Sequence, residues 1–224
     1  MSEAPVAEIV VAVDGTSGSG KSSTCRGVAR RLGLRYLDTG AQFRAMTWWL
    51  LRQGVDVHDT EAVAARAGEP RIESGTDPDA PTIHVDGEDV GVAIRTDEVN
   101  AAVSPVSTVP EVRARLLDLQ REIIGTGGIV VEGRDLGSVV WPDAEVKVYL
   151  TADAEARAAR RAAEQGGSDV TATQQSLLDR DRIDSGRTTA PLVMADGAVQ
   201  IDTTPYTLEK VVDLVVGLAE QVRA

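Results

Sequence analysis

The sequence predicts an α/β fold in which helices cover both faces of a parallel sheet. Residues 9–13 form a continuous run of apolar, mostly β-branched side chains, which is typical of a strand buried on both faces. Along most of the chain, short apolar segments alternate with longer helical ones, and this alternation indicates parallel strands joined by helical crossovers. The alternation breaks between about residues 68 and 107, which predicts a small antiparallel insertion.

The expected elements follow from the same patterns. Strands are expected at residues 9–13, 35–37, 129–131, 146–150 and 199–202. Helices are expected at residues 22–32, 41–52, 110–124, 153–165, 171–183 and 207–222. Within the insertion, short strands are expected at residues 71–74, 82–85 and 88–90, with Asp86-Gly87 as a tight hairpin turn, and a short helix near residues 96–102.

The chain is expected to form one domain over residues 1–224, because its length suits a single core. The core covers about residues 8–67 and 108–224, and the insertion covers about residues 68–107. Irregular stretches at residues 166–168 and 184–189 flank a charged helix, which suggests a mobile lid over about residues 157–187.

Composition excludes several classes of protein. The chain is 42% hydrophobic and 26% charged, and it holds no apolar run near the roughly 20 residues that a membrane span needs. Residues 1–8 lack the basic start and apolar middle of a signal peptide, so a cytoplasmic protein is expected. The net charge of −12 would repel a nucleic-acid polymer. The single cysteine, Cys25, excludes an internal disulfide and is expected to be a small buried residue on a helix.

A phosphate-binding loop follows the first predicted strand. Residues 15–22 (GTSGSGKS) match the pattern G-x-x-x-x-G-K-[ST] and lie between a predicted strand and a predicted helix. The glycines allow backbone N–H groups to turn toward anionic oxygens, and the helix N-terminus points at the same place. Lys21 is expected to reach the β- and γ-phosphates of a nucleotide, and the Ser22 hydroxyl is expected to ligate Mg²⁺. The nucleotide-binding residues are therefore expected to be Gly15, Thr16, Ser17, Gly18, Ser19, Gly20, Lys21, Ser22 and Ser23.

This loop identifies nucleotide binding but not what the nucleotide is used for. GTPases, motor ATPases and small-molecule kinases share it. The chain is too short for a motor's coupled domains, and it lacks the Asn-Lys-x-Asp motif that reads guanine. Two arginines favour a kinase: Arg44 lies one turn into the helix after the second strand, and Arg134 follows another buried strand. Because the carboxyl ends of parallel strands meet at one sheet edge, both are expected to face the acceptor.

Five separated blocks of the chain resemble bacterial cytidylate kinases. They occur in the family's order, at residues 15–22 (GTSGSGKS), 38–44 (DTGAQFR), 94–99 (IRTDEV), 133–137 (GRDLG) and 187–192 (RTTAPL). The resemblance implies a nucleoside monophosphate kinase fold with a CMP-binding insertion and a short lid. It also implies transfer of the γ-phosphoryl group of ATP to CMP or dCMP, with Mg²⁺ as cofactor, by a monomer that uses no membrane or nucleic-acid partner.

The resemblance also assigns substrate-binding and catalytic residues. Around the CMP phosphate it implies Thr39, Arg44, Arg134 and Arg187. For reading the cytosine it implies Ser104, Arg113 and Asp135, although Ser104 by itself reads as a loop or cap serine before Pro105. Near the ribose it implies Arg180 and Asp184. The catalytic residues are expected to be Lys21, Arg134, Arg180 and Arg187.

Lid arginines are expected to neutralise the migrating phosphoryl group. Arg157, Arg160 and Arg161 form a stripe on one predicted helix, and Arg157 and Arg161 are expected to contact ATP; a solvated helix face would show the same pattern. Three residues depart from the family pattern: Phe43 where tyrosine is frequent, Thr39 where serine is frequent, and Glu132 where aspartate is common. The longer Glu132 leaves open whether it helps to hold Mg²⁺.

Two alternatives remain at this point. One is a kinase for another acceptor, such as UMP, AMP or shikimate, which ADP production with each acceptor would reveal. The other is a nucleotide-binding regulator without turnover, which would bind ATP but give no product with any acceptor.

Overall fold

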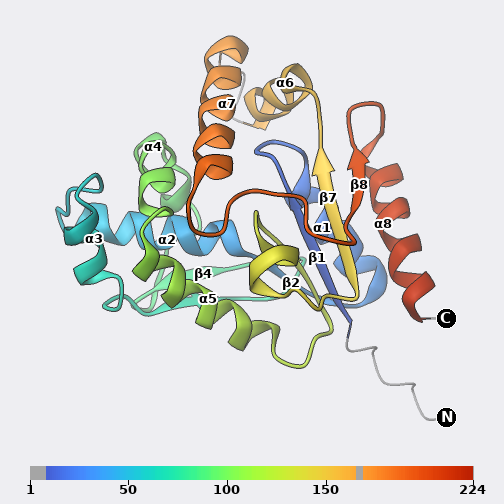
Figure 1. The fold of residues 1–224 in the computed structure, drawn as a ribbon, viewed down its shortest axis with the longest axis horizontal. Helices are drawn as coiled ribbons and strands as arrows, with labels where there is room; N and C mark the ends of the chain where they lie inside the picture. The colour runs from blue at the N-terminus through green and yellow to red at the C-terminus, as the bar shows by residue number, and fades with distance from the viewer. Residues whose placement is uncertain (1–8, 165–168, 224) are drawn as a thin grey trace. The chain divides into compact units, whose positions relative to one another are not determined.

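The structure is a computed structural model that describes residues 9–164 and 169–223 (Figure 1). The irregular stretch expected at residues 166–168, and the chain before residue 9, lie outside the described residues. The chain divides into two compact units. Unit 1 consists of Met1–Tyr36 and Thr126–Ala224, and unit 2 is Leu37–Gly125. None of the described helices is both long and apolar enough to cross a membrane.

Unit 1 contains the predicted sheet. In the part of the chain that the structure describes, five strands lie in the order β2-β6-β1-β7-β8. Their bounds are Arg35–Asp38 for β2, Ile129–Glu132 for β6, Val10–Gly15 for β1, Val146–Thr151 for β7 and Val199–Asp202 for β8. The pairs β1–β6, β1–β7 and β7–β8 are parallel, with Val11 opposite both Val130 and Val146. All six residues of β1 are buried, as its apolar run predicted.

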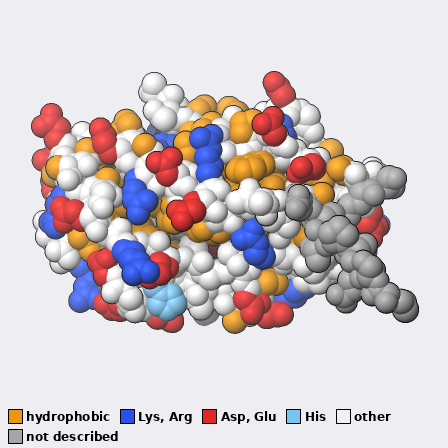
Figure 2. All heavy atoms as spheres, turned by 90° about the horizontal axis from the view of Figure 1, so that it is seen from below, with side chains coloured by type: hydrophobic (Ala, Val, Ile, Leu, Met, Phe, Trp, Pro, Cys, Tyr) orange, Lys and Arg blue, Asp and Glu red, His pale blue; other side chains and the backbone are white. Residues whose placement is uncertain are grey.

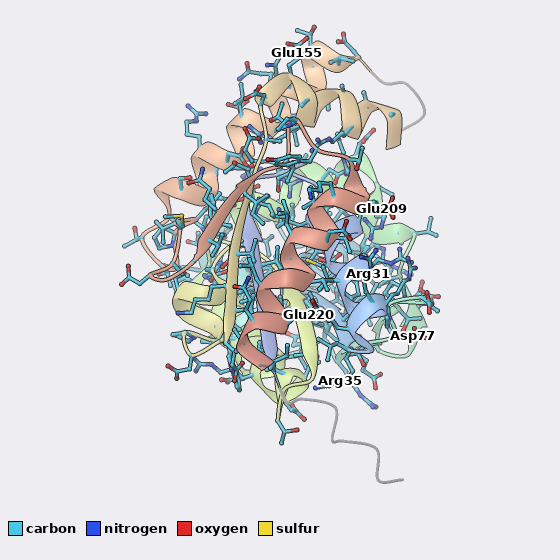
Figure 3. All side chains as sticks on the ribbon, turned by 90° about the vertical axis from the view of Figure 1, so that its right-hand side faces the viewer. Arg31, Arg35, Asp77, Glu155, Glu209 and Glu220 are labelled. Atoms are coloured by element: carbon cyan, nitrogen blue, oxygen red, sulfur yellow. The ribbon has the colours of Figure 1, made fainter. Side chains whose placement is uncertain are left out.

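Helices flank this sheet as predicted: α1 (Lys21–Leu32) and α8 (Leu208–Arg223) pack against its strands and against each other. Helices α6 (Ala154–Glu164) and α7 (Val170–Gly186) pack against each other. α1 and α8 pack closely, because Gly27 leaves room that a Cβ would fill at 2.7 Å from Val212 Cγ2. Cys25 is fully buried in this core, as expected. Arg31, Glu209 and Glu220 lie on the exposed side of the two helices (Figure 3).

Unit 2 contains the predicted antiparallel insertion and the helices before and after it. Strands β3 (Ile72–Ser74), β4 (Ile83–Val85) and β5 (Glu88–Asp89) form a sheet in that order. Asp86 and Gly87 both have positive φ values, 53° and 85°, which is the geometry of the predicted hairpin turn. The helices are α2 (Thr39–Arg52), α3 (Thr60–Arg66), α4 (Asp97–Val106) and α5 (Pro110–Ile124), and a short 3-10 helix covers Ala93–Arg95.

The structure corrects the expectation for the helix near residues 96–102. α4 continues to Val106 and includes Ser104 and Pro105, so Ser104 is a buried helical residue and not a loop or cap residue. The buried residues Val99, Val103 and Val106 continue the helical period, and packing of this face outweighs the missing N–H of Pro105.

Three elements in the described part of the chain were not predicted: the 3-10 helix at Ala93–Arg95, α3 and a π-helical turn. Asp59 caps α3, and its side chain accepts hydrogen bonds from the N–H groups of Glu61 and Ala62. The π-helical turn covers Leu136–Val140, where the sequence suggested only a connection between strands. This turn begins inside the GRDLG block and therefore adjoins part of the candidate site.

Candidate active site

The phosphate-binding loop lies between β1 and α1, as predicted. Gly15 has a φ of +146°, and a Cβ at this position would lie 2.0 Å from the carbonyl oxygen of Leu150, so only glycine fits. Gly20 is the N-cap of α1 in the left-handed conformation. Inside the loop, the Ser19 hydroxyl donates to the carbonyl of Thr16 at 2.9 Å. The residues predicted to bind nucleotide, from Gly15 to Ser23, thus occupy this loop and the first turn of α1.

Lys21 is held by the loop itself. Its Nζ donates to the carbonyl oxygens of Gly15 and Thr16, at 2.9 and 2.7 Å. Burial lowers the pKa of Lys21 to about 7, and the positive charge of Arg134 acts in the same direction. An anion bound beside this ammonium would favour its charged form and would therefore raise the pKa again.

Ser22 faces a buried carboxylate. Its Oγ donates to Oε2 of Glu132 at 3.0 Å, and the Tyr36 hydroxyl donates to the other oxygen, Oε1. Glu132 ends β6 and is 3% exposed. A hydroxyl beside a carboxylate is a set of hard oxygen ligands that suits Mg²⁺, which is usually held by one or two side chains together with phosphates and water. Within the described residues, no cluster of three or more His, Cys, Asp and Glu could hold a metal. The Ser22 hydroxyl and the Glu132 carboxylate, by their chemistry, fit a hard cation such as Mg²⁺.

Asp14 was not predicted to be part of the site, although it directly precedes the phosphate-binding loop. Its two carboxylate oxygens accept hydrogen bonds from the N–H groups of Leu136 and Gly137, both at 2.8 Å. Burial raises the pKa of Asp14 to about 6, against the lowering effect of these two bonds. The carboxylate therefore ties the end of β1 to the π-helical turn that follows Arg134 and Asp135.

Three of the predicted site arginines gather around Asp184 of α7, which is itself a predicted site residue. Arg134 Nε lies 3.0 Å from one oxygen of Asp184, and Arg187 Nη1 lies 3.5 Å from the other. Arg134 also donates to the carbonyl of Gly15, which brings it to the phosphate-binding loop. Arg180 lies close enough to Arg134 and Asp184 for both charges to act on its pKa: Arg134 lowers it and Asp184 raises it. The structure thus joins Arg134, Arg180, Asp184 and Arg187 in one cluster.

Arg180 buries part of its guanidinium without a hydrogen-bond partner. Its Nε, like that of Arg187, is buried and has no hydrogen-bond acceptor among the described residues. Burial lowers its pKa to about 10, and the charge of Arg134 contributes to the decrease. A buried cation beside other cations is costly unless an anion accompanies it. This cluster is therefore suited to receiving a phosphate. Asp135 is also buried, at the start of the π-helical turn.

The lid arginines lie against the phosphate-binding loop. Arg157 donates to the carbonyl of Ser17 at 2.9 Å and pairs with Asp181 of α7. Arg160 donates to the hydroxyl and the carbonyl of Thr203, both at 2.9 Å, and the Thr203 hydroxyl donates to the carbonyl of Ser19. Arg161, half-buried on the same helix, exerts a positive charge on Arg180. The stripe is therefore not simply a solvated face; whether Arg157 and Arg161 contact ATP stays a prediction.

The remaining predicted residues lie in unit 2, on three helices. Thr39 is the buried first residue of α2. Arg44, further along α2, donates to Asn100 Oδ1 at 2.5 Å and to the carbonyl of Ile94 at 3.3 Å. Asn100 and Ser104 are four residues apart on α4, so they share a helix face. Arg44 and Ser104 thus belong to the same region of unit 2.

Arg113 reaches the same region from α5. Its guanidinium lies over the Phe43 ring, 5.3 Å from the centroid, and donates to the carbonyl of Ser107 at 3.1 Å. Phe43 precedes Arg44 on α2, so the phenylalanine that replaces the family's frequent tyrosine supports a predicted base-reading arginine through its ring face.

The sequence analysis missed four residues that hold the predicted ones in place. These are Asp14, Tyr36, Asn100 and Asp181. Asn100 could have been predicted as a site residue, because it lies one helical turn before the predicted Ser104 and therefore on the same helix face. Asp14 and Asp181 each adjoin a predicted site residue. Tyr36 reads as an ordinary strand residue, and nothing in the pattern indicates its bond to Glu132.

A family model and several curated proteins that are similar to this chain carry the same description. A family model described as cytidylate kinase matches residues 11–221. A cytidylate kinase of Streptomyces avermitilis is 57% identical over 221 residues, covering 98% of this chain and 96% of the relative. Those of Streptomyces coelicolor and Nocardia farcinica are 58% and 50% identical, covering 96% and 92% of this chain and 94% and 90% of the relatives.

Two solved structures share the fold at low sequence identity. A gluconokinase from Sinorhizobium meliloti 1021 aligns with a TM-score of 0.51 and 17% identity, covering 96% of this chain and 94% of that one. An uncharacterised protein from Eubacterium ventriosum aligns with a TM-score of 0.52 and 11% identity, covering 95% and 98%. Both likenesses concern the fold alone.

Proposed function

We propose that this chain, which belongs to the cytidylate kinase family, transfers the γ-phosphoryl group of ATP to CMP or dCMP, giving ADP and CDP or dCDP. The observation that carries the proposal is a cationic cluster in unit 1. There, Arg134, Arg180 and Arg187 lie around one carboxylate, Asp184, and the charge of Arg134 also acts on Lys21 in the phosphate-binding loop. A reaction that gathers the phosphates of two nucleotides needs such a cluster.

The reaction requires positioning and charge neutralisation more than covalent chemistry. In an in-line transfer, charge spreads over the oxygens of the migrating group, and preorganised cations stabilise that charge. Lys21 holds the β- and γ-phosphates of ATP, while Arg134, Arg180 and Arg187 neutralise the transferring group. The acceptor phosphate is already ionised at neutral pH, so the residues need not supply a general base. No covalent enzyme intermediate is formed.

Magnesium is the proposed cofactor. When bound, it would neutralise part of the negative charge of the ATP phosphates. The residues that would hold it are Ser22, through its hydroxyl, and Glu132, through the carboxylate oxygen that now accepts from Ser22. The Tyr36 hydroxyl on the other carboxylate oxygen keeps Glu132 oriented toward Ser22.

Recognition of CMP is assigned to the residues that the family resemblance implies, each with its own role. Thr39, Arg44, Arg134 and Arg187 bind its phosphate. Ser104 and Asp135 accept from the cytosine amine, while Arg113 donates to the acceptor edge of the base. Arg180 and Asp184 bind the ribose. Asp184 already receives two arginines, and each carboxylate oxygen keeps a lone pair for a sugar hydroxyl.

We place this reaction in the cytoplasm and expect a monomer that acts on free nucleotides. The net charge of −12 supports small nucleotides over a nucleic-acid polymer. On the face shown in Figure 2, acidic and basic side chains are interspersed, and a polymer's phosphates would meet both signs.

An assay of ADP production across a panel of acceptors tests the proposal. With purified protein, ATP and Mg²⁺, CMP and dCMP should give the highest kcat/KM, and UMP, AMP and shikimate should give much lower values. A higher kcat/KM with any of those three acceptors would assign another kinase activity. ATP binding without ADP production from any acceptor would identify a regulator.

A further inference from the structure

The apex of the phosphate-binding loop is clamped by two helices. Asp181 Oδ1 of α7 accepts a hydrogen bond from the backbone N–H of Ser17 at 3.0 Å. Arg157 Nη1 of α6 donates to the carbonyl of the same residue at 2.9 Å, and it also donates to Asp181 Oδ2. The three residues form a closed ring that engages both backbone polar groups of Ser17.

The ring is buried and packed. The side chain of Arg157 is 6% exposed and that of Asp181 is 14% exposed. A Cβ built on Gly18, the next residue of the loop, would lie 3.2 Å from Arg157 Cβ and 3.4 Å from Leu177 Cδ1. Both helices therefore lie directly against the loop. Removing either charge would leave its partner buried and uncompensated, so the two residues should depend on each other.

We propose that Arg157 and Asp181 form a clamp that fixes the phosphate-binding loop to helices α6 and α7 before nucleotide binds. Asp181 is then a positioning residue, because it directly follows Arg180 on α7 and lies one helical turn before Asp184. Holding Asp181 on Ser17 sets where Arg180 stands relative to Lys21. This second part rests on the proposed function, whereas the clamp itself does not.

The clamp gives Arg157 a different role from the one that the sequence predicts. As an ATP ligand, Arg157 would act on the nucleotide independently of Asp181, and its loss would leave the nucleotide-free loop unchanged. As part of the clamp, Arg157 orders Ser17 when no nucleotide is bound, and its contribution depends on Asp181. The two roles therefore differ in a measurement made without substrate.

The first experiment measures hydrogen exchange of the Ser17 amide by NMR in the nucleotide-free protein. Asp181→Ala should accelerate exchange roughly 10- to 100-fold, as expected for a lost hydrogen bond to a charged acceptor, and Arg157→Met should accelerate it in the same direction. Asp179→Ala is the matched control, because Asp179 lies on the same helix in an exposed pair with Arg182. Amides of β1 report whether each variant remains folded, and Asp181→Asn is the milder substitution if Asp181→Ala unfolds.

An unchanged Ser17 exchange rate in folded Asp181 and Arg157 variants would overturn the clamp. Acceleration by Asp179→Ala equal to that by Asp181→Ala would overturn it as well, because a general loosening of α7 would then be the cause. This experiment needs no turnover, so its result is independent of whether the chain phosphorylates CMP.

The second experiment is a double-mutant cycle in kcat/KM for ATP, with Arg157→Met and Asp181→Ala. If each single substitution lowers kcat/KM about tenfold, the double variant should also be about tenfold lower and not about 100-fold lower, because both break one clamp. Additive losses would show that Arg157 acts without Asp181 and would overturn the proposal. Absent activity in the unmodified protein would instead count against the proposed function and leave the amide-exchange test in force.

Discussion

The two units hold their site residues by different interactions. In unit 1, the site residues lie at the ends of buried strands and on α7, and they include the ion pairs of Asp184 with Arg134 and Arg187. Asp14 and Glu132 are each 3% exposed, and burial lowers the pKa of both Lys21 and Arg180. In unit 2, the site residues lie on helices, where Arg44 contacts amide and carbonyl oxygens and Arg113 contacts a carbonyl and a ring.

We infer from this difference that the two units contribute differently to one reaction: unit 1 stabilises charge, and unit 2 recognises the acceptor. Charges that interact strongly in a buried setting can stabilise developing charge without reorganisation, which is what phosphoryl transfer needs. Hydrogen-bonding groups on packed helices present a fixed pattern of donors and acceptors, which is what recognition of an acceptor needs. Substitutions in unit 1 should therefore change turnover or pH dependence, except at Arg134 and Asp135, which are also assigned to the acceptor. Substitutions in unit 2 should change the affinity for the acceptor.

The largest effect is expected for Lys21→Ala in unit 1. Loss of this preorganised charge should lower kcat about 100- to 1000-fold, corresponding to about 3–4 kcal/mol, while CMP binding is largely retained. Steady-state kinetics and calorimetric titration with CMP measure the two quantities. Substitution of the exposed Lys210 on α8, Lys210→Ala, is the control. Near-normal turnover of the Lys21 variant would contradict the assignment of the loop to nucleotide binding.

A pH-dependent stability effect is expected from Asp14, also in unit 1. Its folded-state pKa is raised from 3.8 to about 6, so the stability that its protonated form contributes is complete below pH 3.8 and is lost as the pH rises through about 6. Asp14→Asn cannot titrate. Between pH 4 and pH 7 the variant should therefore gain about 2 kcal/mol in free energy of unfolding relative to the unmodified protein.

Urea unfolding at several pH values measures the Asp14 effect. The exposed Asp213→Asn on α8 is the control. A constant difference between the Asp14 variant and the unmodified protein across this range would contradict the raised pKa.

Acceptor binding tests unit 2 through Arg44→Met. Loss of a hydrogen bond to a charged phosphate should raise the KM for CMP roughly 10- to 100-fold, with a much smaller change in the KM for ATP. Arg134→Met should raise the KM for CMP in the same way, although Arg134 lies in unit 1. Arg52→Met, exposed on the same helix as Arg44, is the control. Equal changes in both KM values would contradict the assignment of either arginine to the acceptor.

Base recognition is tested by Asp135→Asn. Cytosine presents a donor at its exocyclic amine and an acceptor at ring nitrogen 3, and uracil presents the reverse. Two mismatched buried groups predict a preference for CMP over UMP of roughly 30-fold or more in kcat/KM. The variant should narrow this ratio, because an amide can rotate to donate to uracil. An unchanged ratio would show that Asp135 does not read the base; the exposed Asp143→Asn is the control.

The smallest effect is expected for Glu132→Gln. Loss of the carboxylate beside Ser22 should raise the Mg²⁺ concentration for half-maximal activity about tenfold, as for other residues that orient a metal site. Glu132→Asp, which keeps the charge on a side chain one methylene shorter, should show a smaller change. Activity titrated with Mg²⁺ measures both, and identical Mg²⁺ dependence of all three proteins would exclude Glu132 from the metal site.

Much of the fold was predictable because its signals are local. The run at residues 9–13 and the Asp86-Gly87 turn each depend on neighbouring residues, and both occur as expected. Errors arose where packing outweighed local preference. Pro105 suggested the end of a helix, but the apolar face of α4 continues past it into the core of unit 2.

The candidate site likewise has local features, which the sequence indicates, and non-local contacts, which it does not. The motif at residues 15–22 is contiguous, so the chain order alone identified a phosphate-binding loop with Lys21 and Ser22 in it. Contacts between residues far apart in the chain carry no such signal. Asp14 and Leu136, Ser17 and Asp181, and Tyr36 and Glu132 are each separated by about 100 residues or more.

The sequence by itself therefore determined the fold class, the family and the contiguous motif of the loop. Only the tertiary structure decided the surroundings of these residues: that Lys21 lies in the field of Arg134, that Ser22 faces Glu132, and that Arg157 pairs with Asp181 on the loop. The physical reason is that desolvation and charge pairing depend on what surrounds a side chain in space. Hydrophobic period and turn chemistry, in contrast, are properties of neighbouring residues along the chain.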